Sequence, residues 1–306
     1  MTHVTALVVT YNRRELLQRC LEALTRQSRL PERILVVDNA SDDGTREFLE
    51  SDGWTSHPRF EVIALSENTG GAGGFSIGLE RAIEGGSGWT WMMDDDAEPH
   101  IDALEQLMRV AEDPEHIYGS LASSGASTSW LTTLITPLPK REVEFASDVP
   151  DCAKVQSLPF LGFLIHSQLV ERIGLPDAGY FIAADDVEYC VRAQKAGAEI
   201  VIAGKSRIEH PKSRPYKIQL PGRTLTCLAL PPWKRYYDTR NRLLISRTHY
   251  GTKLFTHTLP GSLVRFLAAM LKEPRRFAQA HAFVAGCFDG LLGLKGKRHQ
   301  KWGIRP

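Results

Sequence analysis

Apolar and polar positions alternate over the first 125 residues in a way that predicts strands and helices in turn. Short β-branched apolar runs are separated by stretches whose apolar residues recur at helical spacing. The predicted strands are 4–10, 33–37, 60–65, 89–93 and 117–123, and the predicted helices are 13–27, 41–49, 72–83 and 99–110. Such alternation is typical of a mostly parallel sheet flanked by helices, so the expected fold class is α/β and Rossmann-like.

The pattern becomes less regular beyond residue 125. Residues 124–158 show no clear period, and residues 205–232 are rich in proline and basic side chains, so we expect both to be irregular. Periodic segments return elsewhere: a strand leading into a helix at 159–170, a helix at 184–196, a strand at 199–203 and a helix at 233–250. The second half is therefore expected to extend the same α/β architecture.

The composition is that of an ordinary globular protein, with 42% hydrophobic and 24% charged residues among 306. This excludes a disordered chain and a small disulfide-rich domain. The five cysteines are scattered without a CxxC pair, which argues against a zinc site and fits a reducing, cytoplasmic compartment. We see no apolar stretch that approaches the roughly 20 residues needed to span a bilayer.

Charge is distributed unevenly. The whole chain has 37 basic and 36 acidic residues, a net charge of +1, which argues against nucleic acid as a partner. Ten basic and two acidic residues lie after residue 250, so this tail carries +8. It holds two apolar-striped helical segments, 259–271 and 277–294, separated by Pro274. Helices of this kind either pack on the body of the protein or lie on an anionic membrane surface, and both remain open.

Three adjacent carboxylates, Asp94, Asp95 and Asp96, follow a predicted buried strand. Ligands of parallel sheets lie beyond the carboxyl ends of the strands, and oxygen ligands suit Mg²⁺ or Mn²⁺. The alternative is an acidic start to the next helix, which explains Glu98 better than three acids directly after a strand. The pattern favours a divalent cation.

A glycine-rich stretch follows the third predicted strand. Four of the five positions from Gly70 to Gly74 are glycine, just before a predicted helix, and this suits close approach of the backbone to an anionic ligand. It matches neither a Walker A loop nor a dinucleotide fingerprint. A flexible turn is the alternative.

Two further groups have chemical potential. Asp185, Asp186 and Glu188 cluster at a predicted helix start, where one carboxylate is suited to act as a general base or, alternatively, to cap the helix. His210 stands alone in the sequence, and such a histidine is more often structural than a ligand. The basic segment 212–217 that follows it is suited to face a diphosphate.

Together these motifs resemble the inverting GT-A glycosyltransferases of family 2, which use nucleotide sugars. The resemblance covers roughly residues 4–245. Its motifs are Val-Val-Thr-Tyr-Asn at 8–12, Val-Val-Asp-Asn-Ala-Ser-Asp-Asp-Gly-Thr at 36–45, Asn-Thr-Gly-Gly-Ala-Gly-Gly-Phe at 68–75, Asp-Asp-Asp at 94–96, Asp-Asp-Val-Glu at 185–188 and Tyr-Tyr-Asp-Thr-Arg-Asn-Arg at 236–242.

The resemblance implies a GT-A domain over residues 1–245, with a nucleotide-sugar half at about 1–125 and an acceptor half at about 126–245. Residues 246–306 are expected to form a basic amphipathic helical extension. The implied donor-binding residues are Thr10, Tyr11, Asn12, Asp38, Asn68, Gly71, Gly73, Asp94, Asp95 and Arg240. The implied metal ligands are Asp94, Asp96 and His210, and the implied base is Asp186 or its neighbour Asp185.

Within the family the chain is most similar to galactofuranosyltransferases and rhamnosyltransferase-like enzymes of cell-wall and surface-polysaccharide synthesis. The interval of 24 residues from Asp186 to His210 is that of the galactofuranosyl enzymes. The resemblance implies UDP-galactofuranose or dTDP-rhamnose as donor. With the basic tail, it favours a polyprenyl-diphosphate-linked saccharide as acceptor and a location at the inner face of the cell membrane.

Two other function classes fit less well. A nucleotidyltransferase normally has a glycine-rich basic loop directly after the first strand, and residues 10–14 contain no glycine. A binding module without catalysis has no need for two separate acidic groups.

Overall fold

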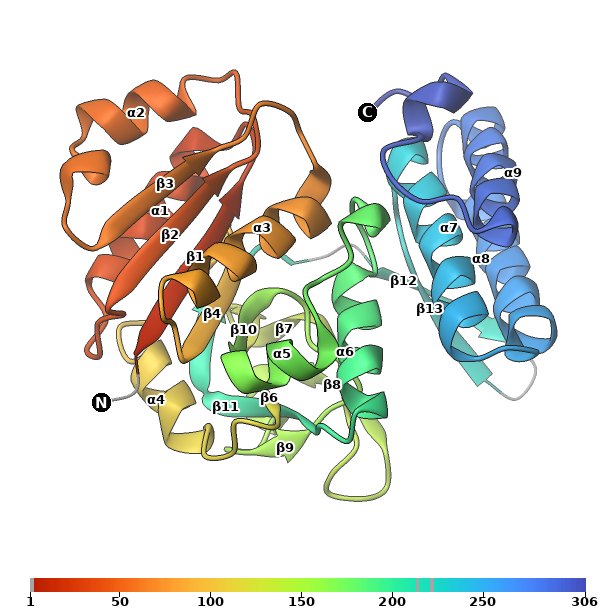
Figure 1. The fold of residues 1–306 in the computed structure, drawn as a ribbon. Helices are drawn as coiled ribbons and strands as arrows, with labels where there is room; N and C mark the ends of the chain where they lie inside the picture. Colours follow the sequence, from red (N-terminus) through yellow and green to blue (C-terminus); the bar gives the residue numbers. More distant parts are fainter. Residues whose placement is uncertain (1–2, 213–214, 221–222) are drawn as a thin grey trace. The chain divides into compact units, whose positions relative to one another are not determined.

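The structure, a computed structural model, describes residues 3–212, 215–220 and 223–306. The chain folds as two compact units. The first unit comprises Met1–Asp177 and Tyr189–Lys212, and the second comprises Ala178–Glu188 and Ser213–Pro306. Each unit is described by itself below (Figure 1).

The first unit is built on one large mixed sheet. Its strands are β1 (Val4–Thr10), β2 (Arg33–Asp38), β3 (Phe60–Ala64), β4 (Trp89–Asp94), β5 (Glu98–Pro99), β6 (Ile117–Ser124), β7 (Ser127–Leu134), β8 (Arg141–Phe145), β9 (Ala153–Lys154), β10 (Leu161–His166) and β11 (Ile200–Glu209). Their main order is β3-β2-β1-β4-β10-β6-β11-β5. Strands β3, β2, β1 and β4 are parallel, and β10 runs antiparallel between β4 and β6.

Helices cover both faces of this sheet (Figure 1). They are α1 (Arg14–Thr25), α2 (Thr45–Ser51), α3 (Gly70–Glu84), α4 (Ala103–Val110), α5 (Ser167–Ile173) and α6 (Asp185–Lys195), whose first turn belongs to the second unit. Successive side chains of β1 point to opposite faces of the sheet, so alternate residues pack in two separate hydrophobic cores. Leu7 and Val9 pack with α3 and α5, whereas Ala6 and Val8 pack with α1 and α4.

The second unit consists mainly of three helices and a hairpin. They are α7 (Pro232–His249), α8 (Leu259–Lys272), α9 (Arg276–Leu292), β12 (Pro215–Leu220) and β13 (Arg223–Leu228). Helices α7 and α9 approach each other closely at two glycines of α9. A Cβ at Gly286 would lie 2.6 Å from the carbonyl oxygen of Tyr236, and one at Gly290 would lie 2.9 Å from that of Arg240. Any side chain at either position would push the two helices apart.

The α/β architecture and the C-terminal helices are confirmed, but two expectations of irregular structure were wrong. Residues 124–158 contain the antiparallel pair β7 and β8. Strand β7 is rich in serine and threonine and shows no apolar alternation, whereas β8 is only five residues long and buries Val143 alone. Strand β11 continues through an irregularity between Ala203 and Arg207, and residues 215–228 include a hairpin.

The expectation about apolar stretches also needs correction. Leu254–Lys272 is long and apolar enough to cross a membrane, judged by length and composition alone. It includes a short π-helical turn, Leu254–Thr258, that continues into α8. The boundary expected after residue 245 falls inside α7.

Candidate active site

Three parallel strands of the first unit end in polar residues at one edge of the sheet. Thr10 of β1 is paired in register with Asp38 of β2, and Val9 is paired with Asp94 of β4. Because parallel neighbours end on the same side, the segments that follow them are brought together. The structure thus gathers residues 10–12, 38–43 and 94–96, as the sequence predicted.

Asp95 and Asp96 both bond to the guanidinium of Arg13. Arg13 Nη1 donates to Asp95 Oδ1 at 3.2 Å and to Asp96 Oδ2 at 2.8 Å. Thr10 Oγ1 donates to Asp95 Oδ2 at 2.8 Å. Burial raises the pKa of Asp95 to about 6, although Arg13 and Thr10 oppose the shift. Asp95 therefore links β1 to the end of β4 as a buried acceptor.

Asp96 faces His210, which follows β11. His210 Nε2 lies 3.3 Å from Asp96 Oδ1, and the ring of His210 lies 6.0 Å from that of Trp130. Burial favours the neutral form of Asp96, but His210 and then Arg13 outweigh it and lower its pKa. The pair predicted across more than 100 residues of sequence is therefore brought together.

The donor set around Asp96 fits a divalent cation. Asp96 Oδ1, apart from its ion pair with His210 Nε2, and His210 Nδ1 are buried atoms that have no hydrogen-bond partner among the described residues. In the part of the chain that the structure describes, no group of three or more Asp, Glu, His or Cys is arranged to hold a metal ion. A carboxylate and an imidazole leave coordination positions open, which suits Mg²⁺ or Mn²⁺ bound jointly with substrate phosphates.

Asn12 and Asp38 shape the turns beside these acids. Asn12 has a left-handed backbone, with φ of 53°, and exchanges two hydrogen bonds with Asp42 at 2.6 and 2.8 Å. Asp38 Oδ1 accepts from the backbone N–H of Ser41 at 3.0 Å. Tyr11 is exposed and lies between Thr10 and Asn12. Of these predicted donor-binding residues, Tyr11 presents the most open surface.

The glycine-rich stretch forms the start of α3. Asn68 Oδ1 accepts from the N–H of Gly70 at 2.8 Å, a bond that closes the turn into the helix. A Cβ at Gly71 would meet nothing within 4 Å, so open space lies beside it. A Cβ at Gly73 would lie 2.4 Å from Oγ1 of Thr69, so this glycine permits a close contact within the protein. Gly71 is the better placed of the two predicted glycines to approach a ligand.

Asp185 and Asp186 lie in the second unit, in the first turn of α6. Burial raises the pKa of both carboxyl groups, and the charge of Asp186 adds to the effect on Asp185. A carboxylate with a raised pKa is a better proton acceptor than an ordinary one. One turn along, Glu188 is paired with His249 of α7 at 2.9 Å.

Arg240 does not have the surroundings expected of a phosphate-binding residue. It is fully buried, and its guanidinium donates to the carbonyl oxygens of Gly179, Tyr180 and Gly296. We therefore leave Arg240 out of the proposed donor site. Within the basic segment 212–217, Ser213 and Arg214 lie outside the described residues.

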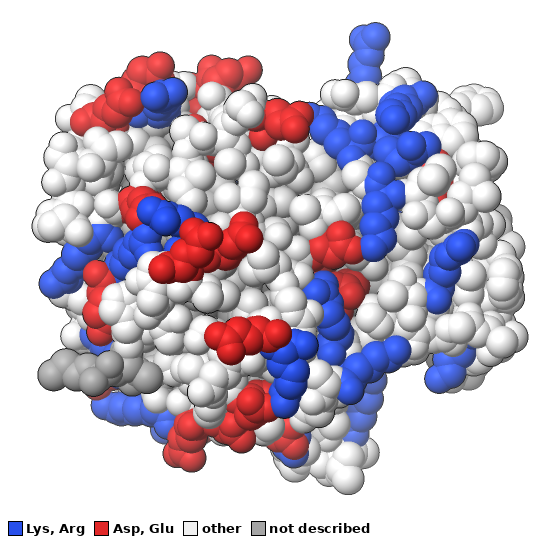
Figure 2. Space-filling view, in the orientation of Figure 1, with Lys and Arg blue, Asp and Glu red and all other residues white. Residues whose placement is uncertain are grey.

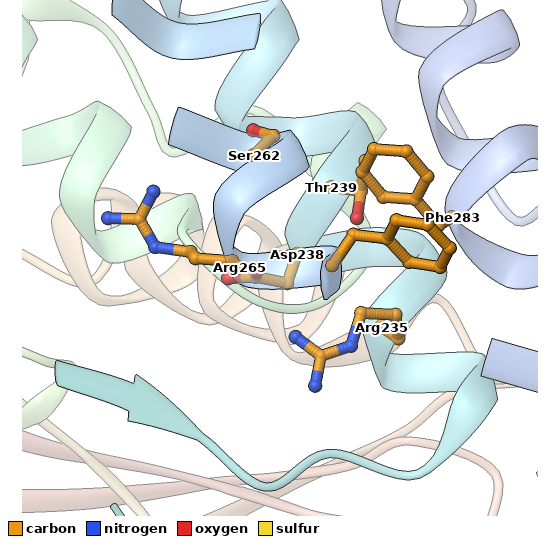
Figure 3. Close-up of a pocket in the computed structure, with 7 residues that line it drawn as sticks. Arg235, Asp238, Thr239, Ser262, Arg265 and Phe283 are labelled. Atoms are coloured by element: carbon orange, nitrogen blue, oxygen red, sulfur yellow. The ribbon is translucent and has the colours of Figure 1, made fainter. Parts of the chain in front are cut away.

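A narrow crevice in the second unit is lined by residues of α7, α8 and α9 (Figure 3). Two of its ionised side chains are paired within the protein. Arg235 pairs with Glu273 at 2.5 Å, and Asp238 pairs with Arg242 at 2.9 Å. We assign no ligand to it.

Several residues of the site were not predicted. Arg13 was noted in the sequence only as part of a loop without glycine. Asn39 is buried and joins β2 to the start of α3, because it donates to Gly70 O at 2.9 Å and accepts from Thr69 N–H at 2.8 Å. The signal for Asn39 was present, since it stands inside the second-strand motif. Trp130 lies in a segment that was expected to be irregular.

Comparisons with known proteins agree on one family. The model of glycosyl transferase family 2 matches residues 5–156. The chain is 30% identical to galactofuranosyltransferase GlfT1 of Mycolicibacterium smegmatis, over 79% of this chain and 83% of that protein. It is 32% identical to GlfT1 of Mycobacterium tuberculosis, over 78% and 80%. It is 20% identical to the dTDP-rhamnosyl transferase RfbF of Shigella flexneri, over 96% and 97%.

Solved structures share the fold. GalNAc-T7, determined with UDP, GalNAc and Mn²⁺, aligns with a TM-score of 0.64 and 13% identity over 99% of this chain and 58% of that one. A mannosyltransferase of Pyrobaculum calidifontis, determined with GDP-mannose and Mn²⁺, aligns with a TM-score of 0.57 and 17% identity over 94% and 87%. At these identities the likeness supports the GT-A fold alone.

Proposed function

The chain belongs to glycosyl transferase family 2, and from this premise we propose that it transfers galactofuranose from UDP-galactofuranose to a saccharide acceptor. The observation that carries the proposal is the similarity to two proteins named galactofuranosyltransferase, at 30% and 32% identity over most of both chains. The proximity of Asp96 and His210 supports the proposal, because these two side chains would hold a cation that binds the diphosphate of such a donor.

The donor would bind at the strand ends of the first unit. Its uracil would lie against Thr10, Tyr11, Asn12 and Asp38, and its ribose near Asn68 and Asp94. Asp96 and His210, with Asp94, would hold Mn²⁺ or Mg²⁺. When bound, the cation supplies Lewis-acid stabilisation of the departing diphosphate. The two solved relatives that contain Mn²⁺ support this assignment by analogy.

Asp186 would act as the general base, with Asp185 as the alternative. The acceptor hydroxyl attacks the anomeric carbon from the face opposite the nucleotide and gives its proton to this carboxylate. The new bond joins the acceptor oxygen to the anomeric carbon, while the bond from that carbon to the diphosphate breaks and UDP departs. A single displacement inverts the configuration and needs no covalent intermediate.

The acceptor would be a polyprenyl-diphosphate-linked saccharide at the inner face of the membrane, in cell-wall or surface-polysaccharide synthesis. Helices α8 and α9 expose large apolar side chains, led by Phe277 at 94% and Leu271 at 77%. Basic residues accompany them, and Figure 2 shows one face on which Lys and Arg outnumber Asp and Glu over this unit. An apolar surface with a basic surround suits an anionic bilayer.

A rhamnosyltransferase that uses dTDP-rhamnose is the second candidate. The similarity to RfbF favours it, because that alignment covers 96% of this chain, although at 20% identity. The division into a donor half at about 1–125 and an acceptor half at about 126–245 is part of both candidates and stays a prediction.

A thermal-shift titration with UDP and dTDP, each with and without Mn²⁺, separates the candidates. A ligand that binds only the folded state raises the melting temperature by mass action. We expect a Mn²⁺-dependent shift with UDP and none with dTDP. A shift with dTDP alone would favour rhamnosyl transfer, and no shift with either nucleotide would contradict the assigned donor site.

A further inference from the structure

The segment that leads into α6, residues 179–184, has an unfavourable backbone. Phe181, Ala183 and Ala184 have φ angles of 65°, 69° and 60°. This left-handed region favours glycine, because a Cβ atom collides there with the backbone. Three such residues within four positions persist only where surrounding contacts hold them. Asp185 and Asp186 follow directly.

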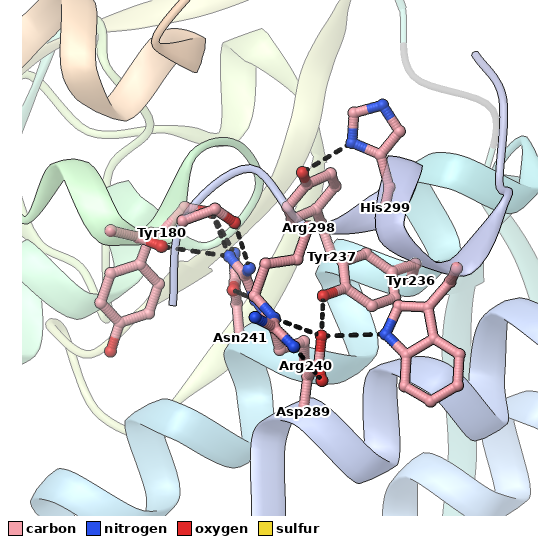
Figure 4. Close-up of polar contacts among 11 residues, drawn as sticks. Tyr180, Tyr236, Tyr237, Arg240, Asn241, Asp289, Arg298 and His299 are labelled. Carbon is pink, nitrogen blue, oxygen red and sulfur yellow. Dashed lines mark hydrogen bonds and ion pairs between the residues drawn. The ribbon is translucent and has the colours of Figure 1, made fainter. Parts of the chain in front are cut away.

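Two consecutive side chains of α7 provide these contacts (Figure 4). Asn241 Nδ2 donates to the carbonyl oxygens of Tyr180, Ile182 and Ala183, at 3.1, 2.9 and 2.6 Å. Arg240 Nη2 donates to the carbonyl oxygens of Gly179 and Tyr180, at 3.2 and 2.7 Å. Both side chains are fully buried. Four of the six carbonyl groups of residues 179–184 are therefore bound by one turn of α7.

The C-terminal segment, residues 295–304, also contacts the strained segment 179–184, at its first residue, Gly179. Gly296 donates its N–H to Gly179 O at 2.6 Å, and its carbonyl accepts from Arg240 Nη1 at 2.6 Å. Asp289 of α9 anchors this segment, since it accepts from Arg298 at 2.8 and 3.2 Å and from Trp302 at 3.1 Å. The last residues of the chain are thus tied to the loop before α6.

We propose that Arg240, Asn241 and the C-terminal segment position the acidic turn, by holding residues 179–184 in the conformation that presents Asp185 and Asp186. The inference rests on the proposed function, in which one of these carboxylates is the base. Arg240 and Asn241 bond to the carbonyl oxygens of this loop, so the two residues act through the backbone. On this account α7 and the C-terminal segment have a positioning role in catalysis.

The test compares Asn241→Ala with Arg235→Ala in the full-length protein. Arg235 is a matched control, because it is a buried polar residue of the same helix whose partners are Glu273, Gln279 and the carbonyl oxygen of Leu228 rather than residues 179–184. Asn241→Ala is expected to lower kcat about 100-fold, since small misplacement of a reacting group has effects of that size. Its KM for the donor should stay unchanged, because the proposed donor-binding residues lie in the first unit. Arg235→Ala should retain kcat when both are assayed well below their melting temperatures.

Equal losses of kcat in the two variants would overturn the inference, as would a rise in KM without a fall in kcat. If Asn241→Ala does not fold, Gly296→Ala serves instead. A Cβ there meets nothing within 4 Å, but its φ of 89° strains the link to Gly179. We expect a lower kcat at constant KM, and an unchanged kcat would overturn the proposal.

A different result would contradict the proposed function. Normal transfer by both Asp185→Asn and Asp186→Asn would remove the base assignment, whatever Asn241→Ala does. Loss of transfer in the carboxylate variants, with Asn241→Ala behaving like Arg235→Ala, would overturn only the positioning role.

Discussion

Asp96 of the first unit and the acidic pair Asp185 and Asp186 of the second unit are held in opposite ways. In the first unit, Asp96 lies against Arg13 and His210, and these neighbours lower its pKa. In the second unit, burial raises the pKa of Asp185 and Asp186. The first arrangement keeps a carboxylate charged, as a cation ligand requires, and the second makes a carboxylate ready to take a proton.

The scaffolds differ as well. The acids of the first unit follow a regular parallel strand, whose neighbours bring the partner residues to the same edge. The acids of the second unit follow a strained loop that depends on side chains of α7 and on the C-terminal segment. We therefore expect the first group to be robust to distant changes and the second to be sensitive to them.

The largest effect is expected for Asp186→Asn. Loss of the general base should lower transfer about 1,000-fold while UDP binding is kept. A radiolabelled-donor assay measures transfer, and calorimetry measures binding. Asp185→Asn is the matched control and should lose less. The reverse order would assign the base to Asp185, and near-normal transfer by Asp186→Asn would contradict its role.

The next effect is expected for Asp96→Ala. Removal of a metal ligand should weaken Mn²⁺-dependent UDP binding at least about tenfold, because even changes around a metal site have effects of this size. Glu98→Ala, in the same acidic stretch, should bind normally. Calorimetric titration with Mn²⁺ checks both, and an unchanged Mn²⁺ affinity in Asp96→Ala would exclude the metal role.

A smaller effect is expected at the apolar surface of the second unit. Phe277→Glu should reduce flotation with anionic liposomes about tenfold. This is the change in binding expected when one large apolar side chain is withdrawn from the bilayer interface. Leu138→Glu is the control, since Leu138 is 79% exposed but belongs to the first unit. Equal flotation of both variants and the wild type would remove these helices from the membrane proposal.

The smallest effect concerns stability. Burial raises the pKa of Asp185 in the folded state, so stability is lost as the pH rises from the ordinary carboxyl pKa through the raised one. Asp185→Asn removes the ionisable group, so the variant does not lose this stability as the pH rises. It should raise the melting temperature by a few degrees at about pH 8, and the gain should vanish near pH 4.

Asp289→Asn provides the contrast for this measurement. Burial opposes ionisation of Asp289, but its bonds with Arg298, Tyr236 and Trp302 outweigh burial and lower its pKa. The substitution should therefore lower the melting temperature at neutral pH, and the loss should shrink as the pH falls. Differential scanning fluorimetry over the pH range checks both variants, and a gain for Asp289→Asn would contradict this sign.

The sheet of the first unit and its strand-end residues could be predicted from the sequence, because local apolar runs and the geometry of parallel strands suffice. The pairing of His210 with Asp96 was predicted from family resemblance, since nothing local in the sequence joins them. Strand β7 could not be predicted, because its serines and threonines show no apolar alternation. The partnership of Arg13 with Asp95 and Asp96 was also missed, since an ion pair depends on the turn that brings the side chains together.

Local patterns along the chain were enough to identify the family, the α/β layers and the carboxylates that are candidates for chemistry. The role of Arg240 became visible only in the folded protein. Its motif is visible at 236–242, but its partners are backbone carbonyls at 179, 180 and 296, and backbone groups have no signature in a sequence. The tertiary structure likewise joined the acidic turn to the C-terminal helices in one unit, because packing between distant segments depends on the folded shape of both.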